Sequence, residues 1–256
     1  MTIGEGASTF PMEPFSGNGR RFTTRRRVRL GDATPAGRMR LDAIARFLQD
    51  IANDDARDGD WSDPHWWVVR RTVVDVHRFP TYLEEVDLAT WCGGIGSHWA
   101  ERRTSMLSLD GQPLVDAAAL WVHVDRDTLQ PSRVPADVAE VLRVSADGRN
   151  VGAKLLLKTS TIDLDAMNVD TWPLRFSDFD AVGHMNNAAY WEVLEEQLLA
   201  DRSVRAPLRA VVEHVAQIEP GAVVDRHVDA TSGEATVVLR ADGSVRAAMW
   251  CGSVGE

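Results

Sequence analysis

The chain has 256 residues, of which 44% are hydrophobic and 26% are charged, as is ordinary for a soluble globular protein. Its formal net charge of −10 argues against general nucleic-acid binding, and no run of about 18 apolar residues is present to span a membrane. The two cysteines, Cys92 and Cys251, lie far apart and have no metal-ligand spacing, so we expect no metal, no cofactor and a reducing, cytoplasmic location.

The start of the chain differs in composition from the rest. Residues 1–19 are rich in Gly, Ser and Pro and lack the apolar region of a signal peptide, so we expect a flexible lead-in. A predicted strand at 22–30 follows, and arginines gather in and just before it: Arg20, Arg21, Arg25, Arg26, Arg27 and Arg29. They form either a solvated strand face or a binding site for phosphates or an acidic carrier protein, and the charge alone does not distinguish these two interpretations.

The first half then continues with one helix and a series of strands. Apolar residues recur at helical spacing in 40–56, which predicts an amphipathic helix. Strands are predicted at 66–79, 84–92, 98–109 and 113–125. The last two flank Asp110-Gly111, a dipeptide typical of a tight hairpin turn. The glycine-rich segment 93–97 is interpreted as a turn or bulge, because a strand and not a helix follows it.

The second half repeats this order after a less patterned segment, 141–170. It contains a predicted strand at 171–177, a helix at 187–201, and strands at 208–218, 222–230, 235–241 and 244–252, the last two flanking Asp242-Gly243. One apolar helix with an antiparallel meander, occurring twice, predicts an α+β fold. We expect a tandem (double) hot-dog, in which each half is an antiparallel sheet wrapped around one long helix. Its domains are predicted at 20–140 and 171–256, with 141–170 as the linker.

A direct sequence repeat supports the duplication. Residues 175–196 align without a gap on residues 29–50, at a constant offset of 175 − 29 = 146. Identical pairs include Asp32/Asp178 and Gly37/Gly183. Four polar residues of the second copy are replaced by residues of a different kind in the first. Asp180, His184, Asn186 and Asn187 align with Thr34, Arg38, Arg40 and Leu41. We therefore expect the working site in the second half and a degenerate site in the first.

The chemistry predicted for this site follows from its position before a helix. Gly183 interrupts regular structure, and Asn186 or Asn187 is a suitable N-cap, so Asp180 and His184 lie on the turn that leads into the helix. Unpaired backbone N–H groups there polarise a carbonyl oxygen, while a carboxylate attacks the carbonyl or activates water. These are the needs of acyl transfer to water. Asp178, by contrast, is expected to be a structural cap.

The segment FSDFDAVGHMNNAAYWEVLEE resembles the signature of the acyl-acyl carrier protein thioesterases, which are double hot-dog enzymes. It is also similar to the hydroxybenzoyl-CoA thioesterase group, in which an Asp of the same turn acts. In the first half, WVVRRTVVDVHRFPTYLEEVDLATW and SLDGQPLVDAAALWVHVDRDTLQPSRVP resemble the strand and hairpin region of the same family. The resemblance covers about 22–230 and implies thioester hydrolysis.

Carried over residue by residue, the resemblance is incomplete. The family's active site is described as an Asp, an Asn two residues later, a His two after that, and a downstream Glu beside a Cys. Asp180 and His184 match the first and third positions, but Val182 occupies the Asn position. The Glu-Cys pair falls most nearly on Gln217 and Ile218, and Gln217 can hold a water but is not a base.

The leading hypothesis is a thioesterase that releases a free fatty acid from an acyl carrier protein or CoA thioester. Two alternatives stay open: an acyl-thioester-binding protein with little or no turnover, and an acyl-thioester hydratase, which the spacing of Asp180 and His184 disfavours. Glu213 and Glu219 lie near Gln217 and are expected to be placed differently from the family's Glu. The tryptophans, among them Trp61, Trp66, Trp67 and Trp191, form either an acyl tunnel or plain core. A monomer or a homodimer is compatible with a double hot-dog.

Overall fold

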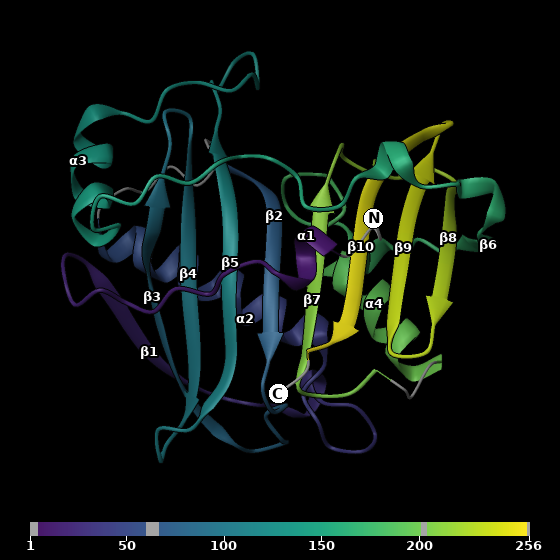
Figure 1. Cartoon of the computed structure of the whole chain (residues 1–256), viewed down its shortest axis with the longest axis horizontal. Helices are drawn as coiled ribbons and strands as arrows, with labels where there is room; N and C mark the ends of the chain where they lie inside the picture. Colours follow the sequence, from purple (N-terminus) through teal and green to yellow (C-terminus); the bar gives the residue numbers. More distant parts are fainter. Residues whose placement is uncertain (1–4, 60–66, 201–203, 255–256) are drawn as a thin grey trace.

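The computed structural model describes residues 5–59, 67–200 and 204–254. Ten strands form one continuous antiparallel sheet in the order β1-β3-β4-β5-β2-β7-β10-β9-β8-β6 (Figure 1). The strands are β1 (Arg21–Arg27), β2 (Trp67–Val76), β3 (Glu85–Ile95), β4 (Trp99–Ser108), β5 (Pro113–His123), β6 (Asn168–Trp172), β7 (Leu208–His214), β8 (Val224–Thr231), β9 (Glu234–Ala241) and β10 (Ser244–Ser253). The five strands of each half are adjacent, and β2 and β7 join the halves by direct pairing, with Val73 opposite Val211.

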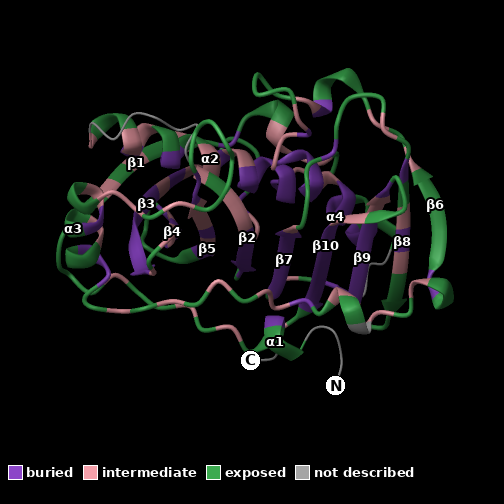
Figure 2. Ribbon diagram, turned by 90° about the horizontal axis from the view of Figure 1, so that it is seen from above, coloured by how far each residue is buried: buried purple, intermediate pink, exposed green. Residues whose placement is uncertain are grey.

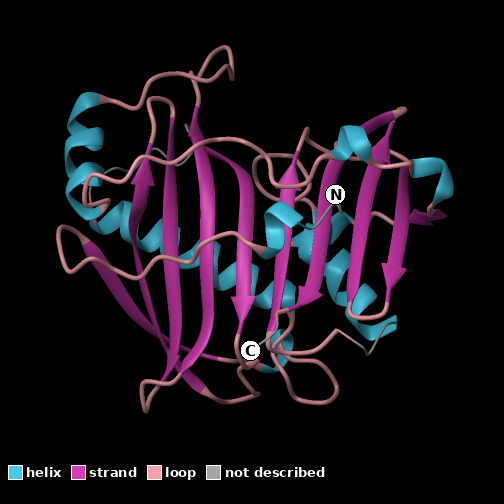
Figure 3. Ribbon diagram, in the orientation of Figure 1, coloured by secondary structure: helices cyan, strands magenta, loops and turns pink. Residues whose placement is uncertain are grey.

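Two long helices lie on the same face of this sheet, as Figures 2 and 3 show. They are α2 (Leu41–Asp58) and α4 (Ala189–Ala200), and they contact each other. Buried apolar side chains of both helices and of both halves of the sheet form one continuous core, which includes Ile44, Leu194 and Leu239. The sheet curves around the apolar side chains of both helices and buries them. This is the double hot-dog arrangement that the sequence predicts.

The hairpin turns and the bulge form where the sequence predicts them. Asp242 and Gly243 adopt φ angles of 51° and 73°, the left-handed region that a tight hairpin turn of this kind requires. Gly111 likewise has a φ of 83° between β4 and β5. Within 93–97, β3 continues to Ile95 and a bulge interrupts its pairing with β4 between Cys92 and Gly94.

Two segments cover the outer face of the sheet, one at the N-terminus and one that connects the two halves. Residues 5–19, which we expected to be a flexible lead-in, pack across it, and a short helix α1 (Glu5–Ser8) places the fully buried Ala7 against Val73 and Val211. Arg209 fixes this segment by donating hydrogen bonds to the carbonyl oxygens of Ala7 and Ser8, each at 3.0 Å. The connection 141–170 crosses the same face (Figure 1) and adds the buried Leu157 to this cluster.

The structure differs from the sequence-based expectation at two elements. A helix that we did not predict, α3 (Ala136–Ser145), packs against β3. The strand expected at 171–177 is β6, which ends at Trp172, and residues Phe176–Asp178 form a turn of 3-10 helix instead. The strand stops there because Pro173 has no N–H to donate to a neighbouring strand.

Candidate active site

The turn before each long helix is built in the same way in the two halves. The buried Asp178 accepts hydrogen bonds from the Arg175 backbone N–H at 2.7 Å and from its Nε at 2.9 Å. In the first half, Asp32 accepts from the Arg29 backbone N–H at 2.8 Å. Because both copies of this aspartate hold the turn together, Asp178 is a structural cap, in agreement with its expected role.

Asp180 lies at the exposed tip of the second turn. Its Oδ1 accepts a hydrogen bond from the Val182 N–H at 2.9 Å, and its Oδ2 accepts one from the Asn186 side-chain amide at 3.1 Å. Gly183 makes the turn possible with a φ of 92°, a backbone angle that residues other than glycine rarely adopt. Asn186 in turn accepts the Ala188 N–H at 2.8 Å and so caps the start of α4. Asp180 and Asn186 are thus joined in one hydrogen-bonded unit.

His184 follows Gly183 in this turn and lies beside Glu219, which the sequence placed near Gln217 without a role in the site. Its Nε2 is 3.6 Å from Oε1 of Glu219, and the His184 side chain is 27% exposed. Gln217 and Val182, on which the resemblance most nearly places the Glu and the Asn of the family, are both exposed. Glu219 therefore supplies a carboxylate near His184 although Gln217 does not, and sequence spacing alone did not show which side chain comes close.

Glu213, the other carboxylate of this region, faces away from the site. Its two oxygens accept the backbone N–H groups of Leu156 and Leu157 on the outer face of the sheet, at 2.6 and 3.1 Å. Burial raises the pKa of Glu213, and these two hydrogen bonds lower it in part. Glu213 holds the connection between the halves and does not reach the turn of Asp180.

The N-termini of the two helices differ in what faces them. In the first half, the carboxylate of the nearly buried Glu195 accepts the Leu41 N–H at 3.0 Å and pairs with both terminal nitrogens of Arg38 at 2.6 and 3.2 Å. Arg38 is the aligned counterpart of His184, and Asn187 is that of Leu41. Among the described residues, the Asn187 N–H has no hydrogen-bond acceptor. An anionic side chain therefore fills the helix terminus of the first half, whereas that of the second half has an unpaired donor.

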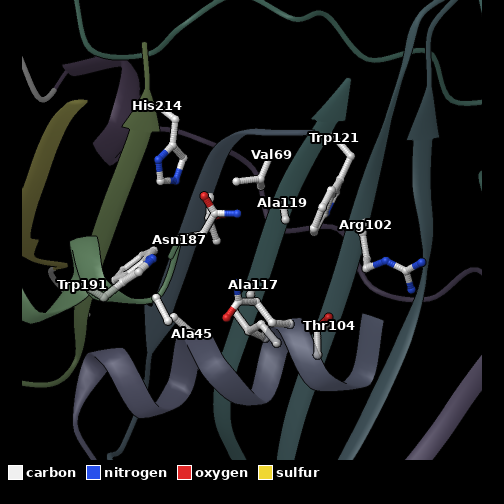
Figure 4. A pocket seen from close by; sticks show the side chains of 14 residues that line it. Ala45, Val69, Arg102, Thr104, Ala117, Ala119, Trp121, Asn187, Trp191 and His214 are labelled. Carbon is white, nitrogen blue, oxygen red and sulfur yellow. The ribbon is translucent and has the colours of Figure 1, made fainter. Parts of the chain in front are cut away.

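A pocket begins at this second helix terminus and runs under the sheet of the first half (Figure 4). Its volume is about 30 Å³, which corresponds to two or three waters at about 10–15 Å³ each. The first half provides most of the wall, and the second half provides the end near α4. The lining residues are Ala45, Leu48, Gln49, Val69, Thr72, Arg102, Thr104, Ala117, Ala119, Trp121, Asn187, Ala188, Trp191 and His214. Each half thus contributes to one site.

Two ring nitrogens in this pocket were not recognised from the sequence. Trp121 Nε1 and His214 Nε2 are buried and have no hydrogen-bond partner among the described residues. Burial lowers the pKa of His214 to about 4, with the nearby Arg70 charge acting in the same direction, so the ring is neutral at physiological pH. The Tyr190 ring packs edge-on against the His214 ring, with 4.7 Å between the two ring centroids. Nothing in the sequence indicates that the two residues share a site, because they belong to β5 and β7, which β2 separates in the sheet.

The arginine cluster at the start of the chain is largely neutralised. Four of its members form ion pairs with aspartate or glutamate side chains: Arg20 with Asp55 and Asp58, Arg25 with Asp87, Arg26 with Asp50 and Asp54, and Arg27 with Glu85. This pairing favours the interpretation as a solvated strand face. It leaves less free positive charge for an acidic partner than the sequence indicates.

Other features of the described residues bear on the remaining expectations. They contain no group of three or more His, Cys, Asp or Glu side chains that could hold a metal ion. Nor do they include a helix with the length and apolar character needed to cross a bilayer. Of the tryptophans named above, Trp191 lines the pocket, whereas Trp61 and Trp66 lie outside the described residues.

Comparison with known sequences identifies relatives along most of the chain. The family model for the acyl-ACP thioesterase N-terminal domain matches residues 19–142, and that for the C-terminal domain matches residues 162–248. An uncharacterised protein of Mycobacterium tuberculosis is 28% identical over 202 residues, covering 78% of this chain and 79% of that protein. A chloroplastic palmitoyl-acyl carrier protein thioesterase of Arabidopsis thaliana is 30% identical over 167 residues, covering 59% of this chain and 40% of that protein. The chain thus spans less than half the length of this plant relative.

Solved structures share the complete double hot-dog fold. A putative oleoyl thioesterase from Lactobacillus plantarum has a TM-score of 0.78 at 17% identity, covering 95% of this chain and all (100%) of that chain. The 12:0-ACP thioesterase from Umbellularia californica has a TM-score of 0.72 at 19% identity, covering 91% of this chain and 96% of that chain. These matches confirm the predicted fold class. With both of its halves matched by the corresponding family models, the chain belongs to the acyl-ACP thioesterase family, whose enzymes hydrolyse thioesters.

Proposed function

We propose that this protein hydrolyses fatty acyl thioesters of acyl carrier protein or CoA to the free acid, using Asp180 and His184 at the start of α4. The observation that carries the proposal is the contrast between the two helix N-termini. In the first half, the Leu41 N–H binds a carboxylate oxygen of Glu195 at 3.0 Å. That contact supports a matching role for the Asn187 N–H, which has no acceptor among the described residues. The substrate carbonyl oxygen takes the place at Asn187 that Glu195 takes at Leu41.

Each residue of the site then has a step to perform. Asp180 accepts a proton from water while the water oxygen attacks the thioester carbon, or its carboxylate attacks that carbon directly. Negative charge develops on the carbonyl oxygen, where the Asn187 N–H and the positive end of α4 stabilise it. The C–S bond then breaks and the thiolate takes up a proton. His184 provides this proton or orients the water, and Oε1 of Glu219 lies 3.6 Å from its Nε2. Attack by water releases the acid directly, whereas attack by Asp180 leaves a mixed anhydride that a water molecule must hydrolyse before the acid is released.

Asn186 is proposed as a positioning residue for Asp180. Its side-chain amide holds Asp180 Oδ2 at 3.1 Å while its own oxygen caps α4 at Ala188. This double contact fixes the carboxylate relative to the helix terminus. Asn187 contributes through its backbone, and the exposed Gln217 is proposed to contact water near the turn.

The test is hydrolysis of a panel of acyl thioesters, on acyl carrier protein and on CoA, by the wild type and Asp180→Asn. We expect the substitution to lower kcat about 10²- to 10⁴-fold, as for loss of a general base. Asp125→Asn is a matched control, because Asp125 is also an exposed turn aspartate that accepts the N–H two residues later, at 3.1 Å. Equal rates for wild type and Asp180→Asn would remove Asp180 from the mechanism.

Two further outcomes separate the remaining alternatives. Single-turnover hydrolysis in ¹⁸O-water, with enzyme in excess, distinguishes the two roles of Asp180. Label in the Asp180 carboxylate indicates a nucleophile, because it enters when water opens the mixed anhydride at the Asp180 carbon. Label in the acid alone, with no anhydride trapped by hydroxylamine, indicates a general base. Saturable acyl-thioester binding with no turnover on any substrate would support the binding protein instead. Val182 and Gln217 are the reason for testing this alternative, because the resemblance places an Asn and a Glu at these positions.

A further inference from the structure

The pocket under the first half of the sheet has a mainly apolar lining, which a few polar side chains interrupt. Thr72, Thr104 and Arg102 line it from three different positions on β2 and β4. The corresponding face of the second half, which packs on α4, is apolar, with Val237, Met249 and other buried side chains. The two halves share one fold, so the polarity belongs to the pocket and is not required by the architecture.

Two buried nitrogens stand on either side of the same end of this pocket. Val69 of β2 is paired with Trp121 of β5, and β7, which ends at His214, is the strand on the other side of β2. The sheet spacing therefore places the backbones of Trp121 and His214 about 10 Å apart. Figure 4 shows both rings flanking Val69, with Asn187 between them. Neither Trp121 Nε1 nor His214 Nε2 has a hydrogen-bond partner among the described residues.

The donor properties of these groups restrict what they can bind. An indole N–H only donates, so Trp121 requires an acceptor, such as an oxygen atom. The guanidinium of Arg102 does not call for an anion, because its Nη1 is 2.5 Å from a carboxylate oxygen of Asp55. A neutral oxygen therefore fits the pocket better than a carboxylate.

The size of the pocket restricts the rest of the ligand. A volume of about 30 Å³ holds two or three waters, which is far less than a palmitoyl or oleoyl chain needs. Trp191 lines the pocket at the α4 end, and Ala117 and Ala119 line it on the sheet.

We propose that this pocket selects a short acyl group that carries a neutral oxygen atom, as a hydroxyl or keto group, and that Trp121 Nε1–H donates a hydrogen bond to that oxygen. The neutral His214 forms the second polar wall, near the start of α4. This inference rests on the proposed function, because it places the acyl part of the substrate in this pocket with its thioester carbonyl at Asn187.

The experiment compares matched CoA thioesters: butyryl, 3-hydroxybutyryl, acetoacetyl and palmitoyl. For the wild type we expect kcat/KM about tenfold higher for the better of the two oxygenated substrates than for butyryl, the size of effect that one buried hydrogen bond produces. Palmitoyl-CoA is expected to be the poorest substrate. In Trp121→Phe, which keeps the ring but removes the N–H, the preference for oxygen is expected to fall to about onefold.

Trp99→Phe is the matched control, because its Nε1 donates to the Val151 carbonyl at 2.7 Å outside the pocket. It is expected to retain the wild-type preference. Ketone analogues of the butyryl and 3-hydroxybutyryl thioesters, with a methylene in place of the sulfur, give the same comparison by calorimetric Kd without turnover. Hydrolysis with equal preference for butyryl, or fastest with palmitoyl, overturns this inference and leaves the proposed function intact. Tighter binding of the oxygenated analogue with no hydrolysis of any thioester supports the inference and overturns the proposed function.

Discussion

The ion pair between Arg38 and Glu195 occupies the N-terminus of α2, and its contribution to stability can be measured directly. Glu195 is 7% exposed and accepts three hydrogen bonds, two from Arg38 and one from the Leu41 N–H. Arg38→Met removes both charged donors and leaves the carboxylate with Leu41 and the helix dipole. Loss of one partner of a buried pair costs about 3–5 kcal/mol, and the 29% exposure of the Arg38 side chain admits water that lowers this figure. We therefore expect a loss of about 2–3 kcal/mol.

Glu195→Gln perturbs the same pair from the other side and is expected to cost less, about 1 kcal/mol. The carboxamide oxygen still accepts the Leu41 N–H, and the partly exposed Arg38 turns to water. Urea unfolding followed by tryptophan fluorescence measures both values, and a single transition is expected because one core extends through both halves. Thioesterase activity should persist in both variants, since the pair lies at the N-terminus of α2 and not at that of α4. Equal losses, or a larger loss for Glu195→Gln, would refute this account of the pair.

Three further predictions separate structural groups from chemical ones. Asp178→Ala should cost about 2–3 kcal/mol in urea unfolding, because it removes a buried carboxylate that accepts two hydrogen bonds from Arg175, whereas Asp180→Ala should cost less than about 0.5 kcal/mol. Burial alone would raise the pKa of Asp42, but hydrogen bonds from Arg40 and Arg46 outweigh burial and lower that pKa. The ionised Asp42 therefore stabilises the fold above its unfolded pKa of about 3.9, and this stability is lost as the pH falls through the lower folded pKa. Asp42→Asn should flatten the fall in unfolding free energy between about pH 5 and pH 2. An unchanged slope would contradict this. Burial raises the pKa of Cys92 to about 11, so a thiol reagent at pH 8 should label it only after unfolding, and rapid labelling of the native protein would contradict its placement.

The elements that could be predicted from the sequence are those fixed by local patterns. The helix expected at 40–56 is Leu41–Asp58, and the hairpin at Asp110-Gly111 forms because the turn dipeptide and its flanking strands lie together in the chain. The aligned repeat likewise located two copies of one turn, including the cap at Asp178. By contrast, α3 has only Ala139 and Ser145 buried, so its sequence carries no clear apolar stripe.

The pocket could not be predicted, because its walls come from strands that meet only in the folded sheet. Trp121 and His214 are 214 − 121 = 93 positions apart in the chain, and the strand β2 brings them to one end of the pocket. The same holds for Glu195, which reaches the helix terminus of the other half, and for Glu219, whose approach to His184 depends on an irregular loop. Sequence periodicity reports which face of an element is buried, but not which distant element it faces.

The pairing of β2 with β7 has a genetic consequence. In an assembly of two identical hot-dog chains, each substitution occurs twice, so a residue that closes one helix terminus closes both. Here the halves are encoded separately within one chain and are held together by that strand pair. Arg38 and Glu195 were therefore free to close one terminus while Asn187 stayed open at the other. Under the roles proposed above, substitutions in the pocket wall around Trp121 leave the turn of Asp180 unchanged, so substrate preference and bond-breaking chemistry can change independently.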